Sequence, residues 1–301
     1  MSGLGRLLTA MVTPFDEEEG VDYGQFKRLA SALIDSGSDG VVVAGTTGER
    51  STLTDEEQIA LFTAAKEAVA GRGTVIAGTG SNCTREGLEM TREAERVGCD
   101  AALLVVPYYN KPTQEGLYQH FKAIAQGTSL PCILYNVPSR TVTNLASETV
   151  IRLSHVDNIV GIKEASGDLN QIARIIDGAD KDFLVYSGND GDTFHVLAMG
   201  GYGVIGVASH LVGRQMKDMM EKLLIGNISE AAALHRRLLP LVNALFVVSN
   251  PIPIKYALNH VGFTVGRPRL PLTEPDERAA AQIEAALKGY TIDLPLAGPR
   301  A

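Results

Sequence analysis

The stretch GVVVAGTTGERSTLTDEEQIALFTAAKEAVAGRGTVIAGT, residues 40–79, contains the unit from which the fold of this chain is built. It opens on a short β-branched run (40–45), continues as a helical segment (54–71) and closes on a second β-branched run (74–79). Thr54 and Glu57 have the spacing of a capping box, and Gly71 is placed to end the helix. Because apolar runs without alternation are typical of parallel strands buried on both faces, the stretch predicts a strand–helix–strand unit.

The same unit recurs along the chain. Segments of helical character follow further short apolar runs at 7–13, 101–106, 132–137, 159–163, 183–187 and 203–208. Eight strands, each followed by a helix, over about 225 residues predict an α/β protein with a (β/α)₈ TIM barrel, and an open doubly wound sheet is the competing arrangement.

The chain changes character near residue 226. From there to residue 301 it has helical stretches and no convincing strand, which predicts a C-terminal α-helical domain (226–301) appended to a catalytic barrel (1–225). The proline-containing tail at 290–301 fits a strap over the domain or a loose end, and the sequence leaves both open.

Composition excludes several classes of function. The 301 residues include 35 acidic and 27 basic side chains, for a net charge of -8 without a basic run, so a nucleic-acid partner is not expected. No apolar run approaches the roughly 20 residues that span a bilayer, so no membrane association is expected. The three cysteines, Cys83, Cys99 and Cys132, lack CxxC spacing, which favours a reducing, cytoplasmic setting over disulfides or a zinc site.

Lys163 ends the apolar run at 159–163. Taken alone, it fits a lysine that pairs with Glu164 or extends to the rim of the barrel. It also fits a Schiff-base nucleophile, because partial burial disfavours the charged form of an amine and leaves free amine to attack a ketone.

Polar motifs follow four other strand candidates, and in a barrel all strand carboxyl ends meet at the active-site face. These motifs are GTTGE (45–49), PYYNKP (107–112), YNVPSR (135–140) and SGND (187–190). GTTGE offers hydroxyls and turn amides that could bind a substrate carboxylate. Tyr135 would place a phenol beside the amine of Lys163. Arg140, in the loop after Tyr135, could bind a substrate carboxylate through two hydrogen bonds. Taken singly, GTTGE could be a plain turn, Tyr135 a core tyrosine and Arg140 a surface arginine. Taken together, the motifs predict an active site.

The motifs VTPF, GTTGE, PYYNKP, YNVPSRT, GIKEASGDL and NPIPIK, in this order and spacing, resemble the dihydrodipicolinate synthase family. These enzymes are lysine-dependent pyruvate aldolases of the N-acetylneuraminate lyase superfamily. The likeness runs over essentially the whole chain. GTTGE and Lys163 are shared across the superfamily and only narrow the class, whereas YNVPSRT and the double tyrosine of PYYNKP are more particular to the synthase branch.

The resemblance implies a reaction. Pyruvate would condense with Lys163 as an imine, lose a methyl proton to become an enamine and attack the aldehyde of L-aspartate 4-semialdehyde. Cyclisation would give 4-hydroxytetrahydrodipicolinate, on the diaminopimelate route to lysine. An iminium is itself an electron sink, so neither a metal nor another cofactor is expected.

The resemblance also assigns roles to residues of this chain. Tyr135 would act as general acid and base, and Thr46 would link it in a proton relay to Tyr109, which would come from a neighbouring chain across a dimer interface. The family is commonly a homotetramer, a dimer of dimers.

The substrates would be held by four further residues. The backbone and hydroxyl of Thr47 would bind the carboxylate of pyruvate, and Arg140 that of the semialdehyde. The backbones of Gly188 and Ile205 would line the pocket.

A regulatory pocket is implied at the dimer interface of feedback-inhibited relatives, where lysine binds. Tyr108, Asn82 and Glu86 match its positions. The loop after GTTGE departs from them, because such relatives carry a small residue and histidines where this chain has Arg50, Asp55 and Gln58, with Ser51 beside them. The Arg50 cation should repel the amino groups of lysine, so we expect weak or absent lysine inhibition.

Two alternatives remain. A sibling aldolase, such as an N-acetylneuraminate lyase or a 2-keto-3-deoxy sugar acid aldolase, would share Lys163 and Tyr135 but needs hydroxyl-binding groups in place of Arg140. A barrel that has lost catalysis and only binds ligands is the second alternative, since fold does not fix function. The intact set of chemically suited residues argues against it.

Overall fold

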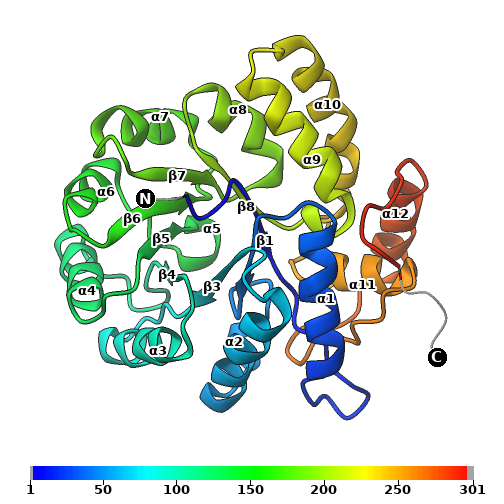
Figure 1. The fold of residues 1–301 in the computed structure, drawn as a ribbon, viewed down its shortest axis with the longest axis horizontal. Coiled ribbons are helices and arrows are strands. Elements are labelled where there is room, and N and C mark those ends of the chain that lie inside the picture. Colours follow the sequence, from blue (N-terminus) through cyan, green and yellow to red (C-terminus); the bar gives the residue numbers. More distant parts are fainter. Residues whose placement is uncertain (1–2, 297–301) are drawn as a thin grey trace.

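Eight parallel strands close into a barrel in the computed structural model, which describes residues 3–296 (Figure 1). The strands are β1 (Leu7–Ala10), β2 (Gly40–Val43), β3 (Thr74–Gly78), β4 (Ala101–Val105), β5 (Cys132–Asn136), β6 (Ile159–Glu164), β7 (Leu184–Ser187) and β8 (Gly203–Gly206). Each strand pairs with the next, and β8 pairs with β1 in parallel register. The predicted TIM barrel is therefore confirmed over the open doubly wound sheet.

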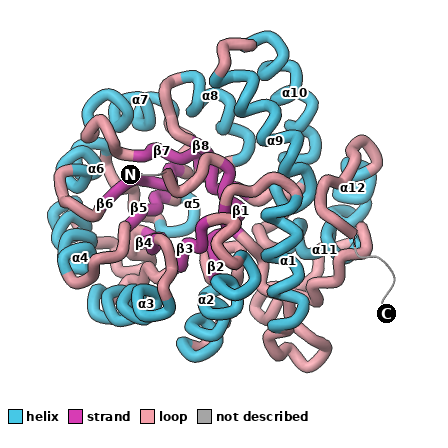
Figure 2. Tube along the Cα trace, viewed as in Figure 1, coloured by secondary structure: helices cyan, strands magenta, loops and turns pink. Residues whose placement is uncertain are grey.

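Helices surround the strands as an outer ring (Figure 2). The ring consists of α1 (Tyr23–Asp35), α2 (Asp55–Val69), α3 (Thr84–Val97), α4 (Gln114–Gln126), α6 (Ser147–Ser154), α7 (Leu169–Gly178), α8 (Thr193–Ala198) and α9 (Ser209–Leu224). The short helix α5 (Pro138–Thr141) lies inside this ring in the view, and two 3₁₀ turns, η1 (Arg50–Thr52) and η2 (Asp190–Asp192), follow β2 and β7. The predicted capping box is present at the start of α2, where Thr54 and Glu57 bond to each other's backbone N–H groups. That helix ends on Ala70 in the left-handed conformation, one residue before the predicted Gly71.

Two buried layers alternate along the strands. Inside the barrel lie side chains such as Leu103 and Tyr135, whereas Leu104 and Leu134 face the core between strands and helices. Ile162 belongs to the outer layer. Because successive strand residues point to opposite faces, the residue that follows Ile162 in β6 faces the inside of the barrel.

Three helices follow the barrel and lie beside α9 and α1 (Figure 1). They are α10 (Ile228–Ala244), α11 (Ile252–His260) and α12 (Glu277–Leu287). Apolar residues of these helices, among them Leu241, Ile254 and Ile283, belong to the same buried cluster as the outer layer of the barrel. The predicted helical appendage is therefore present and shares the barrel's outer core, and its division from residues 1–225 as a domain stays a prediction.

The first part of the tail lies against α9. The N–H of Asp293 donates to the Leu211 carbonyl at 2.7 Å, and the N–H of Gln215 donates to the Asp293 carboxylate at 3.1 Å. Leu294 is buried. Residues 290–296 thus form a strap, while positions 297–301 of the predicted tail lie outside the described residues.

Within residues 3–296, no helix combines the length and the apolar character needed to cross a bilayer.

Candidate active site

Lys163 and Tyr135 are partners in the parallel register of β6 and β5. Both residues are 6% exposed, and the Lys163 Nζ lies 4.4 Å from the centre of the Tyr135 ring. The next pair in the register, Glu164 and Asn136, is directed to the other face of the sheet. The strands thus place one amine and one phenol side by side inside the barrel.

Glu164 does not pair with Lys163, which was one of the competing interpretations. Its carboxylate accepts bonds from Asn136 Nδ2 at 3.0 Å, Gln171 Nε2 at 3.1 Å and the Ser166 N–H at 2.7 Å. Burial raises the pKa of Glu164, and these amide donors oppose that shift. Lys163 is also too buried to be a lysine that extends into solvent at the rim.

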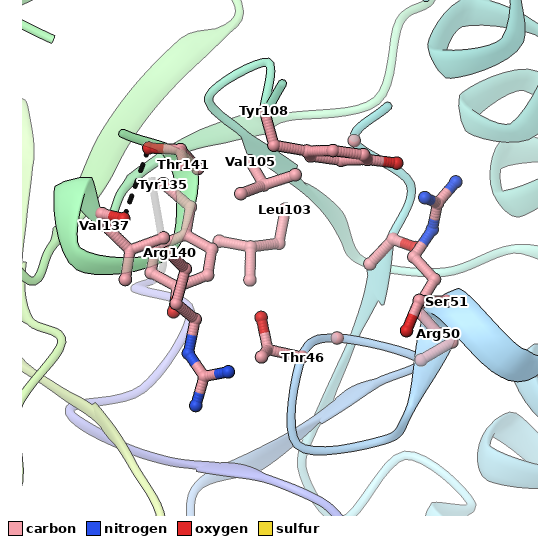
Figure 3. Close-up of a pocket in the computed structure, with 14 residues that line it drawn as sticks. Thr46, Arg50, Ser51, Leu103, Val105, Tyr108, Tyr135, Val137, Arg140 and Thr141 are labelled. Carbon is pink, nitrogen blue, oxygen red and sulfur yellow. Dashed lines mark hydrogen bonds between the residues drawn. The ribbon is translucent and has the colours of Figure 1, made fainter. Parts of the chain in front are cut away.

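A cavity of about 210 Å³ opens beside Tyr135, next to the ends of strands β2 to β5. The residues that line it include Gly45, Thr46, Leu103, Tyr135, Val137 and Arg140. In Figure 3, Thr46 lies between the wall that carries Arg140 and Tyr135 and the wall that carries Arg50 and Ser51. The cavity is of a size for a small organic acid.

The GTTGE turn (45–49) is fixed by polar contacts from far along the chain. Thr47 is 3% exposed, and its hydroxyl oxygen accepts a bond from Asn250 Nδ2 at 2.9 Å. Glu49 takes a left-handed conformation (φ 58°) and accepts from Lys255 Nζ at 2.8 Å. Burial lowers the pKa of Lys255 to about 8, and the Glu49 carboxylate opposes this shift.

Arg140 lies on the short helix α5, not in the loop that the sequence predicted. Pro138 sits in the first turn of that helix, where its fixed φ and missing N–H are tolerated. The Arg140 Nη2 donates to the Asn250 carbonyl at 3.0 Å, and the side chain lines the cavity (Figure 3). The guanidinium is thereby held at the cavity wall with donors to spare.

The other predicted substrate-binding residues do not line this cavity. Ile205 is fully buried in β8 and belongs to the inner layer of the barrel. Gly188 follows β7, and its N–H donates to the Glu164 carbonyl at 2.7 Å. A Cβ at Gly188 would lie 2.6 Å from that of Ala165, so this close approach requires glycine. Lys163 and Thr47 are likewise absent from the cavity wall, among the residues that the structure describes.

Tyr109 stands apart from this group. It is 90% exposed, and its backbone has a positive φ of 73° in the segment between β4 and α4. Within the described part of the chain, no hydrogen bond joins Tyr109 to Thr46. The phenol is therefore free for contact from outside its own chain.

A second cavity, of about 400 Å³, contains six of the seven residues predicted for the regulatory pocket. Its lining includes Arg50, Ser51, Asp55, Gln58, Glu86 and Tyr108. The seventh residue, Asn82, does not line it but donates from Nδ2 to the Tyr108 carbonyl at 3.2 Å. The further carboxylates of Glu89 and Glu93 complete an acidic surround.

Arg50, Ser51 and Tyr108 line both cavities and form the wall between them. The guanidinium of Arg50 donates to the carbonyls of Gly78 (3.0 Å) and Thr79 (3.3 Å). Burial lowers the pKa of Arg50, while Tyr108, Asp55 and Glu86 oppose that shift. The cation is thus anchored to the end of β3.

No role was predicted for Asp190, which ends the SGND motif (187–190), or for Asn250 and Lys255. Asp190 is 5% exposed, and its carboxylate accepts from the Val207 N–H at 2.9 Å. Burial raises the pKa of Asp190. The backbone N–H groups of Val207 and Ala208 and the charge of Lys163 oppose this shift. Asn250 and Lys255 begin and end the NPIPIK motif, which was the only sequence signal that could have drawn attention to them.

Comparison with known proteins gives consistent matches. A sequence model described as the dihydrodipicolinate synthetase family matches residues 3–290. The 4-hydroxy-tetrahydrodipicolinate synthase of Dehalococcoides mccartyi (strain CBDB1) is 66% identical over 98% of this chain and 100% of the relative. That of Moorella thermoacetica is 54% identical over 94% and 97%.

Solved structures agree. A dihydrodipicolinate synthase from Bacillus anthracis superposes with a TM-score of 0.94 at 45% identity, over 96% of this chain and 99% of that one. The enzyme from Cyanidioschyzon merolae, solved with lysine bound, gives a TM-score of 0.94 at 48% identity, over 95% and 98%.

Proposed function

The chain belongs to the dihydrodipicolinate synthetase family, and on this premise we propose that it condenses pyruvate with L-aspartate 4-semialdehyde, the 4-hydroxy-tetrahydrodipicolinate synthase reaction. It is a lyase of the class I aldolase type, placed at the entry of the diaminopimelate route to lysine. Full-length relatives at up to 66% identity carry this name, and they favour it over the sibling aldolases and over a barrel that only binds ligands.

The observation that carries the mechanism is the Lys163–Tyr135 pair. The Lys163 amine attacks the ketone carbon of pyruvate, and Tyr135 delivers a proton to the departing hydroxyl, so that water leaves and a protonated imine remains. The imine withdraws electrons from the adjacent methyl group, whose proton Tyr135 then removes to give the enamine. No metal or other cofactor is required by this sequence of steps.

The enamine carbon attacks the aldehyde of the second substrate, forming the new C–C bond. The amino group of that substrate then displaces Lys163 from the imine carbon, closing the ring and freeing the amine. One water is lost over the whole reaction, in the first step. Lys163 is unchanged at the end.

The two substrates are distinguished by their carboxylate partners. Thr47 binds pyruvate through its backbone and hydroxyl, with the backbones of Gly188 and Ile205 along the inner side. Arg140 binds the carboxylate of the semialdehyde. Its anchored guanidinium at the cavity wall supports this role, because two of its donors can meet one carboxylate.

The proton relay requires a second chain. Thr46 connects Tyr135 to Tyr109 of a neighbouring protomer, and the exposure of Tyr109 in the isolated chain supports this exchange. The protein therefore works as a homo-oligomer, a tetramer built as a dimer of dimers.

We further propose a cytoplasmic, reducing setting. Cys83, Cys99 and Cys132 are free thiols, and burial raises the pKa of Cys99 to about 12. These thiols are compatible with that setting, since a thiol kept protonated resists oxidation.

Borohydride reduction in the presence of pyruvate tests the mechanism. We expect a mass increase of one reduced pyruvate, located on Lys163 by peptide mapping. Modification of another lysine, or none, would refute the proposal. Parallel assays of pyruvate release from sialic acid and of semialdehyde condensation separate the sibling aldolases.

A further inference from the structure

Asn250 joins the two residues to which we assign the substrate carboxylates. Its side-chain Nδ2 donates to the Thr47 hydroxyl oxygen at 2.9 Å, and its main-chain carbonyl accepts from Arg140 Nη2 at 3.0 Å. Asn250 lies between α10 and α11, more than two hundred residues from Thr47. One residue of the C-terminal appendage therefore contacts both residues of the barrel that we assign to substrate binding.

The direction of the bond to Thr47 has a chemical consequence. A hydroxyl has one hydrogen and two acceptor positions. Because the Asn250 amide donates to the oxygen, the hydrogen of the Thr47 hydroxyl stays available to donate to a carboxylate. The amide also fixes the rotation of that hydroxyl, which decides where the hydrogen points.

A buried amide at position 250 does not serve the stability of the fold. It is 6% exposed, and within the described residues its Oδ1 has no hydrogen-bond partner. A buried acceptor without a partner costs stability that an apolar side chain would not. A role at Thr47 accounts for an amide at this position.

A second contact, made by Lys255, fixes the position of Asn250 relative to the GTTGE turn. Lys255, five residues along the same motif, is 1% exposed and donates to the Glu49 carboxylate at 2.8 Å and to the Thr13 carbonyl at 3.0 Å. The segment 250–255 is therefore bonded to the GTTGE turn at both of its ends. The amide of Asn250 has little freedom to move away from Thr47.

We propose that Asn250 is a positioning residue, which aims the Thr47 hydroxyl at the carboxylate of pyruvate through its side chain and holds Arg140 for the second substrate through its main chain. This inference rests on the proposed function. It predicts that variants of the Asn250 side chain change the KM for pyruvate alone, because they leave in place the main-chain carbonyl that binds Arg140.

Three variants test it by steady-state kinetics. Asn250→Ala should raise the KM for pyruvate about 3- to 10-fold, the range expected for one hydrogen bond, with kcat and the KM for the semialdehyde changed less than about twofold. Asn250→Asp should be worse than Asn250→Ala, although it is closer in shape, because its carboxylate accepts the Thr47 hydrogen and repels the substrate. A purely structural role predicts the opposite order, and that order would overturn the proposal.

Asn259→Ala is the matched control. Asn259 lies on α11, donates to the Gly266 carbonyl at 3.0 Å and accepts from the Val265 N–H at 2.7 Å, and makes neither of the contacts of Asn250. Its loss should leave the KM for pyruvate unchanged. An equal rise of the KM for pyruvate in Asn250→Ala and Asn259→Ala would show a general effect of the appendage and overturn the proposal.

A double-mutant cycle completes the test. In a Thr47→Val background, Asn250→Ala should raise the KM for pyruvate less than about twofold further, since the hydroxyl that it positions is gone. Full additivity would overturn the proposal. Borohydride trapping on the wild-type enzyme separates this outcome from failure of the proposed function: an adduct on Lys163 with additive effects rejects the role of Asn250 alone.

Discussion

The amine of Lys163 lies 4.4 Å from the centre of the Tyr135 ring because the two residues are direct partners in neighbouring parallel strands. Strands give a rigid mount, and a one-residue shift of either strand would turn its own side chain to the opposite face and separate the pair. The chemistry that we propose therefore depends on β5–β6 register rather than on loop conformation.

Replacing Tyr135 by phenylalanine should lower kcat by about 10²- to 10⁴-fold, the usual contribution of a positioned acid and base. Stopped-flow or coupled condensation assays would measure this. Tyr186→Phe is the control, since Tyr186 is the partner of Lys163 on β7 but directs its hydroxyl to the Gly5 carbonyl at 3.0 Å. Equal losses in the two variants would contradict an acid–base role for Tyr135.

Removing the guanidinium with Arg140→Ala should raise the KM for the semialdehyde by about 10- to 100-fold, the range for hydrogen bonds to a charged group. Imine formation with pyruvate, followed by borohydride trapping, should proceed nearly unchanged. Arg174, which is exposed on α7 and bonds to the Asn170 carbonyl, provides the arginine control. A selective loss of pyruvate trapping in Arg140→Ala would reassign the residue to the first substrate.

Mixing two inactive variants tests whether Tyr109 crosses between chains. A mixed dimer of Lys163→Ala and Tyr109→Phe subunits contains one site with an intact lysine and an intact neighbouring tyrosine, so activity should return on mixing after subunit exchange. Each variant alone should stay far less active. If Tyr109 served its own chain, mixing would restore nothing.

Lysine in the low millimolar range should inhibit the condensation weakly or not at all. Arg50 is the reason, because its anchored cation faces the second cavity where the amino groups of lysine would lie. Arg50→Ser should strengthen any inhibition. Strong inhibition of the wild type would mean that Asp55 and the three glutamates of that cavity outweigh the arginine.

Acid should destabilise the protein between about pH 6.5 and pH 4. Burial lowers the pKa of His120 and of His210 to about 4, so the unfolded chain binds protons below pH 6.5 that the folded chain does not. The free energy of unfolding therefore falls as pH falls, by up to about 3 kcal/mol for each histidine at pH 4. Denaturant unfolding at several pH values would measure it.

His120→Gln should flatten this pH dependence, since it removes one of the two imidazoles whose pKa burial lowers to about 4. His155→Gln is the control, because His155 lies at the surface beside Asp180 and is more than half exposed. If the free energy of unfolding changed with pH equally in the wild type, His120→Gln and His155→Gln, the role assigned to His120 would be wrong.

The sequence predicted all eight strands because runs buried on both faces have a distinctive composition. It placed their ends less well. The runs at 7–13 and 203–208 extend beyond β1 and β8, which stop at Ala10 and Gly206. Met11, Val12 and Val207 are as buried as the strand residues, so hydrophobicity does not mark where pairing ends.

The site was predicted less completely than the fold. Lys163 and Tyr135 could be paired from the sequence, since each lies near the carboxyl end of a predicted strand and the two strands are consecutive. Asn250 and Lys255 could not, because their partners Thr47 and Glu49 lie 203 and 206 positions away. Sequence spacing carries no information about such contacts until the fold is known.

The ion pair of Lys255 and Glu49 bears on how this enzyme could be shortened or recombined. A chain cut after residue 225 would keep every strand, yet would remove both Lys255 and the Arg269 N–H that bind the Glu49 carboxylate. In the full chain, removing the Lys255 cation alone would leave a buried anion unpaired, an arrangement that typically costs about 3–5 kcal/mol. Chimaeras that exchange the last helices between homologues should therefore carry the GTTGE turn and the NPIPIK segment from one parent.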